Sequence, residues 1–124
     1  MNLDELATAT KEALGDQVSF VGTEPFDNSK KALDDIQVRI RMEDWVGLTD
    51  NLQTGEVEGF LVRITATIRA RWARHNAESL RNDQCKTVVA EFADKGWAFR
   101  GLAFDEDDDL VFAVMEFVRV EEYF

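Results

Sequence analysis

The sequence contains few of the residues that build chemical sites, with one cysteine, one histidine and one proline among 124 residues. Cys85 has no second cysteine for a disulfide, and its place in a helical pattern predicts a small buried side chain. His75 has no companion residues at the spacing of a metal site or a catalytic pair. We therefore expect no metal, no cofactor and no catalytic residue, and we expect that the protein is not an enzyme.

Long hydrophobic runs are also missing. No stretch approaches the roughly 18 apolar residues that a membrane-spanning helix needs. Residues 1–5 lack the basic region of a secretory signal, and no long apolar run follows them. The sequence therefore predicts a chain made in the cytoplasm, without membrane contact. With 45% hydrophobic residues, residues 1–124 are enough to bury the core of a single domain.

Basic residues are scarce beside acidic ones. The chain has 14 Lys and Arg residues against 25 Asp and Glu residues, which gives a formal net charge of -11. Proteins that bind nucleic acid through its phosphates need clustered basic side chains, so this charge argues against that class. It is compatible with DNA that passes nearby without binding, because an acidic wall repels phosphates.

Two stretches, residues 36–42 and 60–72, carry an apolar residue at every second position. This alternation is typical of a strand with one buried and one solvent-exposed face. The exposed positions hold much of the chain's positive charge, in Arg39, Arg41, Arg63, Arg69 and Arg71. A basic sheet face on an acidic chain predicts that copies of the protein associate, with these arginines at the seam.

The remaining segments predict an α+β fold with a mostly antiparallel sheet, an N-terminal helix, one central helix packed on the sheet and a C-terminal β-hairpin. Asn2 caps the first helix, and Gly96 ends the central one, with Trp97 placed for the contact of a Schellman motif. Besides the two alternating strands, the expected elements are helices at 2–14 and 76–95 and strands at 18–21, 97–104 and 110–120.

A long connection, residues 43–59, is expected between the two alternating strands. It holds Trp45, Val46, Leu48 and Leu52 among polar residues, and low-complexity disorder does not usually carry such side chains. We therefore predict a loop whose apolar side chains pack against a protein surface, either that of its own domain or that of a partner. Two readings remain open: Trp45 folds back onto its own domain, or the loop is exposed and marks a partner surface.

Acidic residues gather in the expected turn of the last hairpin, where Asp105, Asp107 and Asp109 alternate. The spacing is similar to that of calcium loops, but the glycine bend and the distal glutamate of such loops are absent. The turn is either a solvated tip or an electrostatic contact. In the second case it meets the arginines of a neighbouring copy and sets the register of a ring, with Arg63, Arg69, Arg71 and Arg74 as its partners.

The order of these elements resembles the tail-terminator and neck proteins of long-tailed bacteriophages, with the lambda-type tail terminator as an example. The likeness covers most of the chain in architecture and contains no diagnostic motif. It is carried by Leu3-Asp4-Glu5-Leu6 at the start of a helix, the two alternating strands with a long loop between them, the single later helix, the strand Trp97-Ala98-Phe99-Arg100, the acidic turn 105–109 and a last strand running to Tyr123-Phe124.

The resemblance implies a virion protein that is assembled in the host cytoplasm and forms a hexameric ring. Such a ring caps the tail tube, stops its polymerisation and offers a surface to the head–tail connector. It implies that DNA passes through an acidic lumen without specific binding. It also implies that the segment with Trp45, Leu48 and Leu52 contacts the tube and that the arginine face forms the seam between subunits.

Two other functions remain open. One is a different virion role, as a head-completion protein, a connector or a tail-tube subunit that polymerises without limit. The other is a small cystatin-like or NTF2-like binding domain with a concave sheet. In that class the pocket would be lined by aromatic side chains, namely Trp72, Trp97, Phe99 and Phe112. The residue types favour an ordinary aromatic core over such a pocket.

Overall fold

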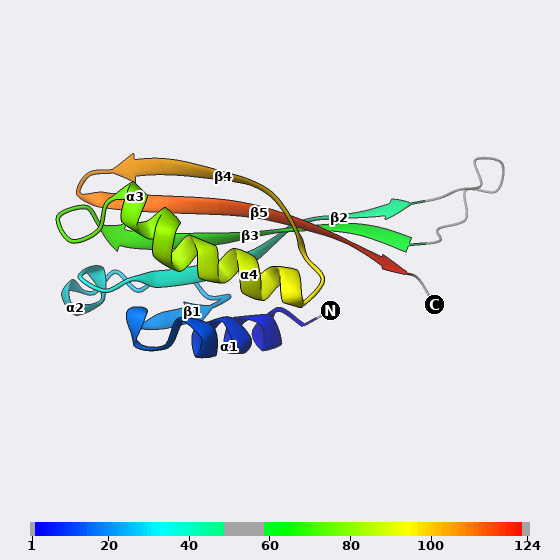
Figure 1. Cartoon of the computed structure of the whole chain (residues 1–124), viewed down its shortest axis with the longest axis horizontal. Helices are drawn as coiled ribbons and strands as arrows, with labels where there is room; N and C mark the ends of the chain where they lie inside the picture. Colours follow the sequence, from blue (N-terminus) through cyan, green and yellow to red (C-terminus); the bar gives the residue numbers. More distant parts are fainter. Residues whose placement is uncertain (1, 49–58, 123–124) are drawn as a thin grey trace.

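The computed structural model describes residues 2–48 and 59–122, without the side chains of Leu48 and Glu122. In chain order the elements are α1 (Leu3–Leu14), η1 (Gly15–Gln17), β1 (Phe20–Gly22), α2 (Lys30–Leu33), β2 (Gln37–Leu48), β3 (Gly59–Arg71), α3 (Ala77–Leu80), η2 (Arg81–Cys85), α4 (Lys86–Asp94), β4 (Ala98–Asp107) and β5 (Leu110–Glu122). Helices α1 and α4 lie against the same side of one sheet (Figure 1). The predicted α+β class is confirmed.

The sheet has five strands in the order β1-β2-β3-β5-β4. The pairs β2–β3, β3–β5 and β5–β4 are antiparallel, whereas β1 runs parallel to β2, so the sheet is mixed but mostly antiparallel. β1 pairs only with residues 37–39 of β2. From Ile40 onward, β2 therefore lies at one edge of the described sheet, and β4 lies along the opposite edge.

Helix α1 begins and ends as its sequence predicts. The Asn2 side chain accepts hydrogen bonds from the backbone N–H groups of Asp4 and Glu5, at 2.9 and 3.3 Å. Gly15 ends the helix with a φ of 61°, in the region that glycine enters without steric cost. The helix turns one apolar stripe toward the sheet, with Leu6, Ala7, Thr10 and Leu14 buried.

The central helix is one continuous segment built from α3, η2 and α4, with a π-helical turn in the middle. Asn76 caps it by accepting a hydrogen bond from the N–H of Ser79 at 2.8 Å. At the other end the N–H of Trp97 donates to Phe92 and that of Gly96 donates to Ala93, which is the predicted Schellman pattern.

The core lies between the sheet and these two helices. Phe92 of α4 packs on Phe117 of β5, with ring centroids 4.5 Å apart. We call this side of the sheet the helix-covered face and the other side the open face. On the helix-covered face β3 buries every second residue, namely Val62, Ile64, Ala66, Ile68 and Ala70.

Several predicted boundaries are wrong, and two β-bulges explain most of the difference. Strand β2 continues through residues 43–48, where a loop was expected, because the register shifts between Met42 and Asp44 and the alternation changes phase there. Strand β4 has a similar shift after Phe99 and continues to Asp107, so the final turn is shorter than predicted. The second alternating run ends at Arg71, which leaves Trp72 outside the strand and 47% exposed.

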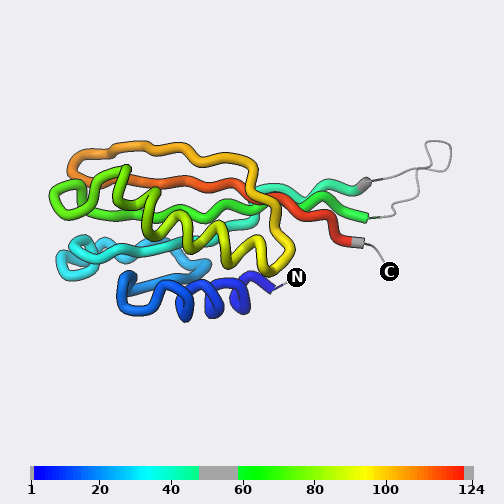
Figure 2. Tube along the Cα trace, in the orientation of Figure 1, coloured from blue at the N-terminus to red at the C-terminus, as the bar shows by residue number. Residues whose placement is uncertain are grey.

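Strands β2, β3 and β5 extend past the helices at one end of the molecule (Figure 2). We call this three-stranded extension the arm and define it as residues 45–48, 59–62 and 119–122, which pair with one another beyond the last β4 partner, Val118. Among the described residues no helix lies over the arm, whereas α1 and α4 cover one face of the rest of the sheet (Figure 1).

Candidate interaction surfaces

The arm exposes large apolar side chains on both of its faces. Trp45 is 57% exposed on the side that continues the helix-covered face, whereas Val46 and Val120 lie on the opposite side, with Val120 59% exposed. The Trp45 ring makes an edge-on contact with Phe60, with centroids 5.0 Å apart. Trp45 thus packs on its own sheet and still offers most of its surface to a partner.

The tube contact was also predicted to include Leu48 and Leu52. Leu48 is the last described residue of β2, and Leu52 lies outside the described residues. Trp45 lies within β2, not in the loop that the sequence predicted. Other exposed apolar side chains to which the sequence did not point are those of Val120 in the arm and of Met42 and Phe104, which are 38% and 37% exposed at the two sheet edges.

The five predicted arginines lie on the open face, but each has a partner within the molecule. Arg63 pairs with Asp44 and Glu116, and its hydrogen bond to Asp44 raises the pKa of the Arg63 guanidinium. Arg41 lies 3.9 Å from Glu43, and Arg39 donates to the carbonyl oxygen of Thr23 at 3.4 Å. Acidic neighbours therefore balance this face, and it is not the uniformly basic surface that the alternation suggests.

Arg69 differs from the others because it is buried, with only 3% of its surface exposed. The segment between β1 and α2 covers it on the open face. Its guanidinium donates to the Asp27 carbonyl and to Asn28 Oδ1, and it stacks over the Phe26 ring at 4.7 Å. Desolvation lowers the pKa of Arg69, and the nearby Asp27 carboxylate acts in the opposite direction. In the monomer this residue secures a loop and is not available to a neighbour.

The acidic residues of the last hairpin are divided between a strand and a turn. Asp105 and Asp107 belong to β4 and are exposed, whereas Asp108 and Asp109 form the turn, with a φ of 58° at Asp108. Asp109 lies 3.6 Å from Arg71, whose guanidinium also pairs with Asp34 at 3.2 Å. Asp109 and Arg71 therefore meet within one copy, while Asp105 and Asp107 remain on the surface.

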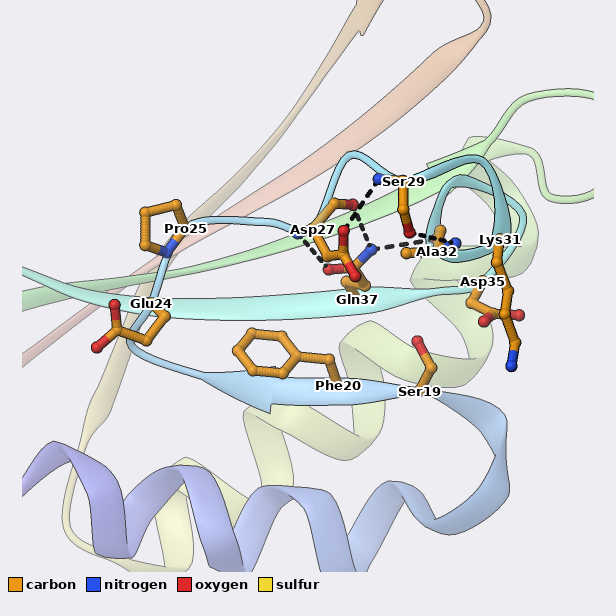
Figure 3. Close-up of a pocket in the computed structure, with 10 residues that line it drawn as sticks. All are labelled: Ser19, Phe20, Glu24, Pro25, Asp27, Ser29, Lys31, Ala32, Asp35 and Gln37. Atoms are coloured by element: carbon orange, nitrogen blue, oxygen red, sulfur yellow. Dashed lines mark hydrogen bonds between the residues drawn. The ribbon is translucent and has the colours of Figure 1, made fainter.

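A hollow of about 340 Å³ opens between β1, β2 and α2 (Figure 3). Its floor is organised by Gln37, which is buried and exchanges hydrogen bonds of 3.0 Å with the backbone of Asp27 and donates to Ala32 at 3.1 Å. These contacts satisfy the Gln37 amide without a ligand. The carboxylates at the rim, Glu24, Asp27 and Asp35, face solvent with Lys31 nearby. The arrangement fixes the loop over Arg69 and offers no acid–base pair.

The four aromatic residues that a ligand-binding domain would need do not converge. Trp97 is buried, with Arg119 stacked 4.3 Å from its ring, and Phe99 lies on the helix-covered face beside Phe117. Phe112 lies on the open face against Phe26, and Trp72 is in the turn after β3. Because they occupy two faces and one end of the sheet, they do not line a common pocket.

Cys85 and His75, the candidates for nucleophilic or metal chemistry, do not form a site together. Cys85 is buried, and burial raises the pKa of its thiol to about 11. His75 lies in the turn after β3, where its N–H donates to Arg71 at 3.0 Å. Residues 2–48 and 59–122 contain no group of three His, Cys, Asp or Glu side chains that could hold a metal ion. Over the same ranges no helix is long and apolar enough to cross a membrane.

Comparison with models of known protein families finds no match, and comparison with curated proteins finds no significant relative. The features of the molecule that bear on its function are the surfaces described above: an apolar arm, two sheet edges and an open face with balanced charges.

Proposed function

We propose that the protein is a structural subunit of a long-tailed phage virion, a tail terminator that forms a ring, caps the tail tube and joins it to the head connector. The observation that carries this proposal is the arm. It extends the sheet beyond its helices and exposes Trp45, Val46 and Val120 to solvent. Exposed apolar side chains at the end of a sheet extension do not add to the core of a monomer, whereas a docking protein uses them as its contact.

The distribution of charge supports the same role. The chain carries a net charge of -11, and Arg41, Arg63 and Arg71 of its open face are paired with acidic side chains of the same molecule. Such a surface has little attraction for phosphates. A ring built from it lets DNA pass through its lumen without holding it. The ring forms in the host cytoplasm and remains in the virion.

Two other roles differ in how copies assemble. A tail-tube subunit adds copies without limit, and a head-completion protein or connector forms a ring with a different docking partner. A cystatin-like or NTF2-like binding domain would be a monomer or dimer. The dispersed positions of Trp97, Phe99 and Phe112 give this last function no pocket, so we favour the ring.

Electron microscopy of the purified protein in negative stain tests the proposal. We expect closed rings of about six copies with a central channel. Tubes of indefinite length would identify a tube subunit instead, and particles of monomer or dimer size at every concentration would contradict a ring-forming protein.

The arm is tested by Trp45→Ala, which removes the most exposed aromatic side chain described in the arm and keeps the backbone of β2 and the Arg41 and Met42 side chains in place. We expect rings of normal size that no longer add to tail tubes in a sedimentation assay. Trp72→Ala is the matched control, because Trp72 is similarly exposed but lies in the turn after β3. Equal loss of tube binding in both variants would mean that the arm is not the docking element.

A further inference from the structure

The sheet ends in two edges that have no strand beside them among the described residues. On one side β1 pairs with β2 only as far as Arg39, so the stretch from Ile40 to Leu48 is open. On the other side β4 is the last strand of the sheet. Unpaired edges of this length expose backbone N–H and C=O groups that can accept a further strand.

The directions of the two edges are complementary. β2 and β5 both run antiparallel to β3, so they share a direction, and β4 runs antiparallel to β5. The β4 edge of one copy and the β2 edge of the next therefore meet in antiparallel orientation when the copies are related by rotation about an axis along the strands. A contact between different edges of identical chains is heterologous, and it closes into a ring when the rotation allows.

The side chains favour one register. Met42 and Phe104 both lie on the helix-covered face, because they pair with Ile64 and Ala113, whose side chains are buried there. Their side chains are also exposed to a similar degree. The adjacent residues, Arg41 and Asp105, lie on the open face, are exposed and have opposite charges. Because antiparallel strands run in opposite senses, placing Met42 opposite Phe104 also places Arg41 opposite Asp105.

The position of β1 favours the same register. β1 occupies the edge of β2 up to Arg39, so an incoming strand can pair only further along β2. Within one molecule Met42 lies in the row of Phe99, because Ile64 links the two through Phe117. Phe104 lies four rows further along the sheet than Phe99, because the rows are counted on β5 from Phe117 to Ala113. Pairing Met42 with Phe104 therefore shifts each copy along the strands by roughly 14 Å, at about 3.4 Å per row. A stagger of this kind tilts the strands and curves a continuous sheet toward a closed cylinder.

We propose that the β2 edge of one copy pairs antiparallel with the β4 edge of a second copy, with Met42 opposite Phe104 and Arg41 opposite Asp105. The inference rests on the proposed function only in expecting that the chain of copies closes into a ring. It assigns the electrostatic contact between copies to Asp105 and Arg41, whereas Asp109 and Arg71 pair within a single copy.

Disulfide trapping tests this register. Arg41→Cys and Asp105→Cys are made in separate chains, mixed and oxidised. A bond between them must join two copies, because β2 and β4 of one molecule are separated by two strands, or roughly 14 Å at about 4.8 Å per strand spacing. We expect a crosslinked dimer in the mixture and none in either variant alone. The buried Cys85 thiol stays protonated at pH 8, and the unmodified protein serves as its control.

A control pair keeps the same edges but breaks the register. Arg41→Cys mixed with Ala103→Cys places the second thiol two residues away on the same face of β4. We expect little crosslinking. Equal yields from the two mixtures, or a bond formed by Arg41→Cys with itself, would overturn the proposed pairing, the latter because it would join two β2 edges.

Solution mass separates this inference from the ring itself. Rings without the expected crosslink would overturn the edge pairing and leave the ring. The expected crosslink with chains that grow without closing would support the pairing and contradict the terminator. A monomer without crosslinks would overturn both.

Discussion

At the scale of single residues, the buried arginine distinguishes this sheet from a simple amphipathic one. Arg69 occupies a position that alternation assigns to solvent, yet it is 3% exposed beneath the segment between β1 and α2. Its hydrogen-bond partners, Asp27 and Asn28, lie more than 40 positions away from it in the sequence. No local pattern reports such a partner, so the sequence could place Arg69 on the correct face but not predict its burial.

Replacement of Arg69 should destabilise the fold. Arg69→Ala removes one of the two donors to the Asp27 carbonyl, the donor to Asn28 Oδ1 and the stacking on Phe26, so we expect the free energy of unfolding to fall by about 1–3 kcal/mol. Urea denaturation measures the change. Arg41→Ala is the control, since Arg41 is exposed and its ion pair is long, and we expect about 0–1 kcal/mol. Equal effects would contradict the burial of Arg69.

Cys85 gives a second prediction at this scale. Burial raises the pKa of its thiol to about 11, so the folded protein at pH 8 should react very slowly with a thiol reagent. An Ala103→Cys variant provides an exposed thiol in the same chain, and it should react rapidly. Labelling of Cys85 as fast as the introduced thiol would show that the core is open at that position.

The same shift has a consequence for stability. The folded state holds the Cys85 proton more tightly than the unfolded state, whose thiol has its ordinary pKa of about 8.5. The unfolded state therefore ionises first as the pH rises. The contribution of this proton to the free energy of unfolding is complete below the ordinary pKa, and it is lost as the pH rises through the folded pKa of about 11.

At the scale of elements, the helices could be read from the sequence because their ends are local. Asn2 and Asn76 cap them, and Gly96 with Trp97 ends the central one. The strand boundaries are harder to predict from the sequence, because the bulge between Met42 and Asp44 reverses which residues face the core. Trp45 then falls out of phase and reads as part of a loop. The partners of the arginines depend on tertiary contacts and could not be read at all.

The end of the central helix supplies a prediction for one element. Gly96 has a φ of 89°, where a side chain is strained, so Gly96→Ala should lower the free energy of unfolding by roughly 1–2 kcal/mol. Gly101→Ala is the matched control, because Gly101 has no positive φ and a Cβ there would meet no atom within 4 Å. Thermal denaturation compares the two. A larger loss for Gly101→Ala would contradict the Schellman assignment.

At the scale of the whole molecule, the structure combines a closed core with surfaces that a monomer leaves unused. The helices cover one end of the sheet and the arm extends beyond them (Figure 1), while among the described residues no strand pairs with β4 on its outer side or with β2 beyond Arg39. The sequence predicted association of copies from its arginines. The structure pairs these arginines largely within one chain, so we propose the sheet edges as the contact between copies instead.

Charge exchange tests the contact between copies. Arg41→Asp and Asp105→Arg should each weaken assembly, because each places like charges opposite one another in the proposed register. The double variant restores an opposite pair and should recover assembly. Failure of the double variant to assemble better than either single one would contradict the Arg41–Asp105 contact.

The most direct test of the account is the solution mass of the purified protein, measured by light scattering behind a sizing column at low and high salt. We predict assembly toward about six copies, weaker at high salt because the exposed Arg41–Asp105 contact is screened. A monomer at every salt and protein concentration would contradict the claim that this chain forms a ring.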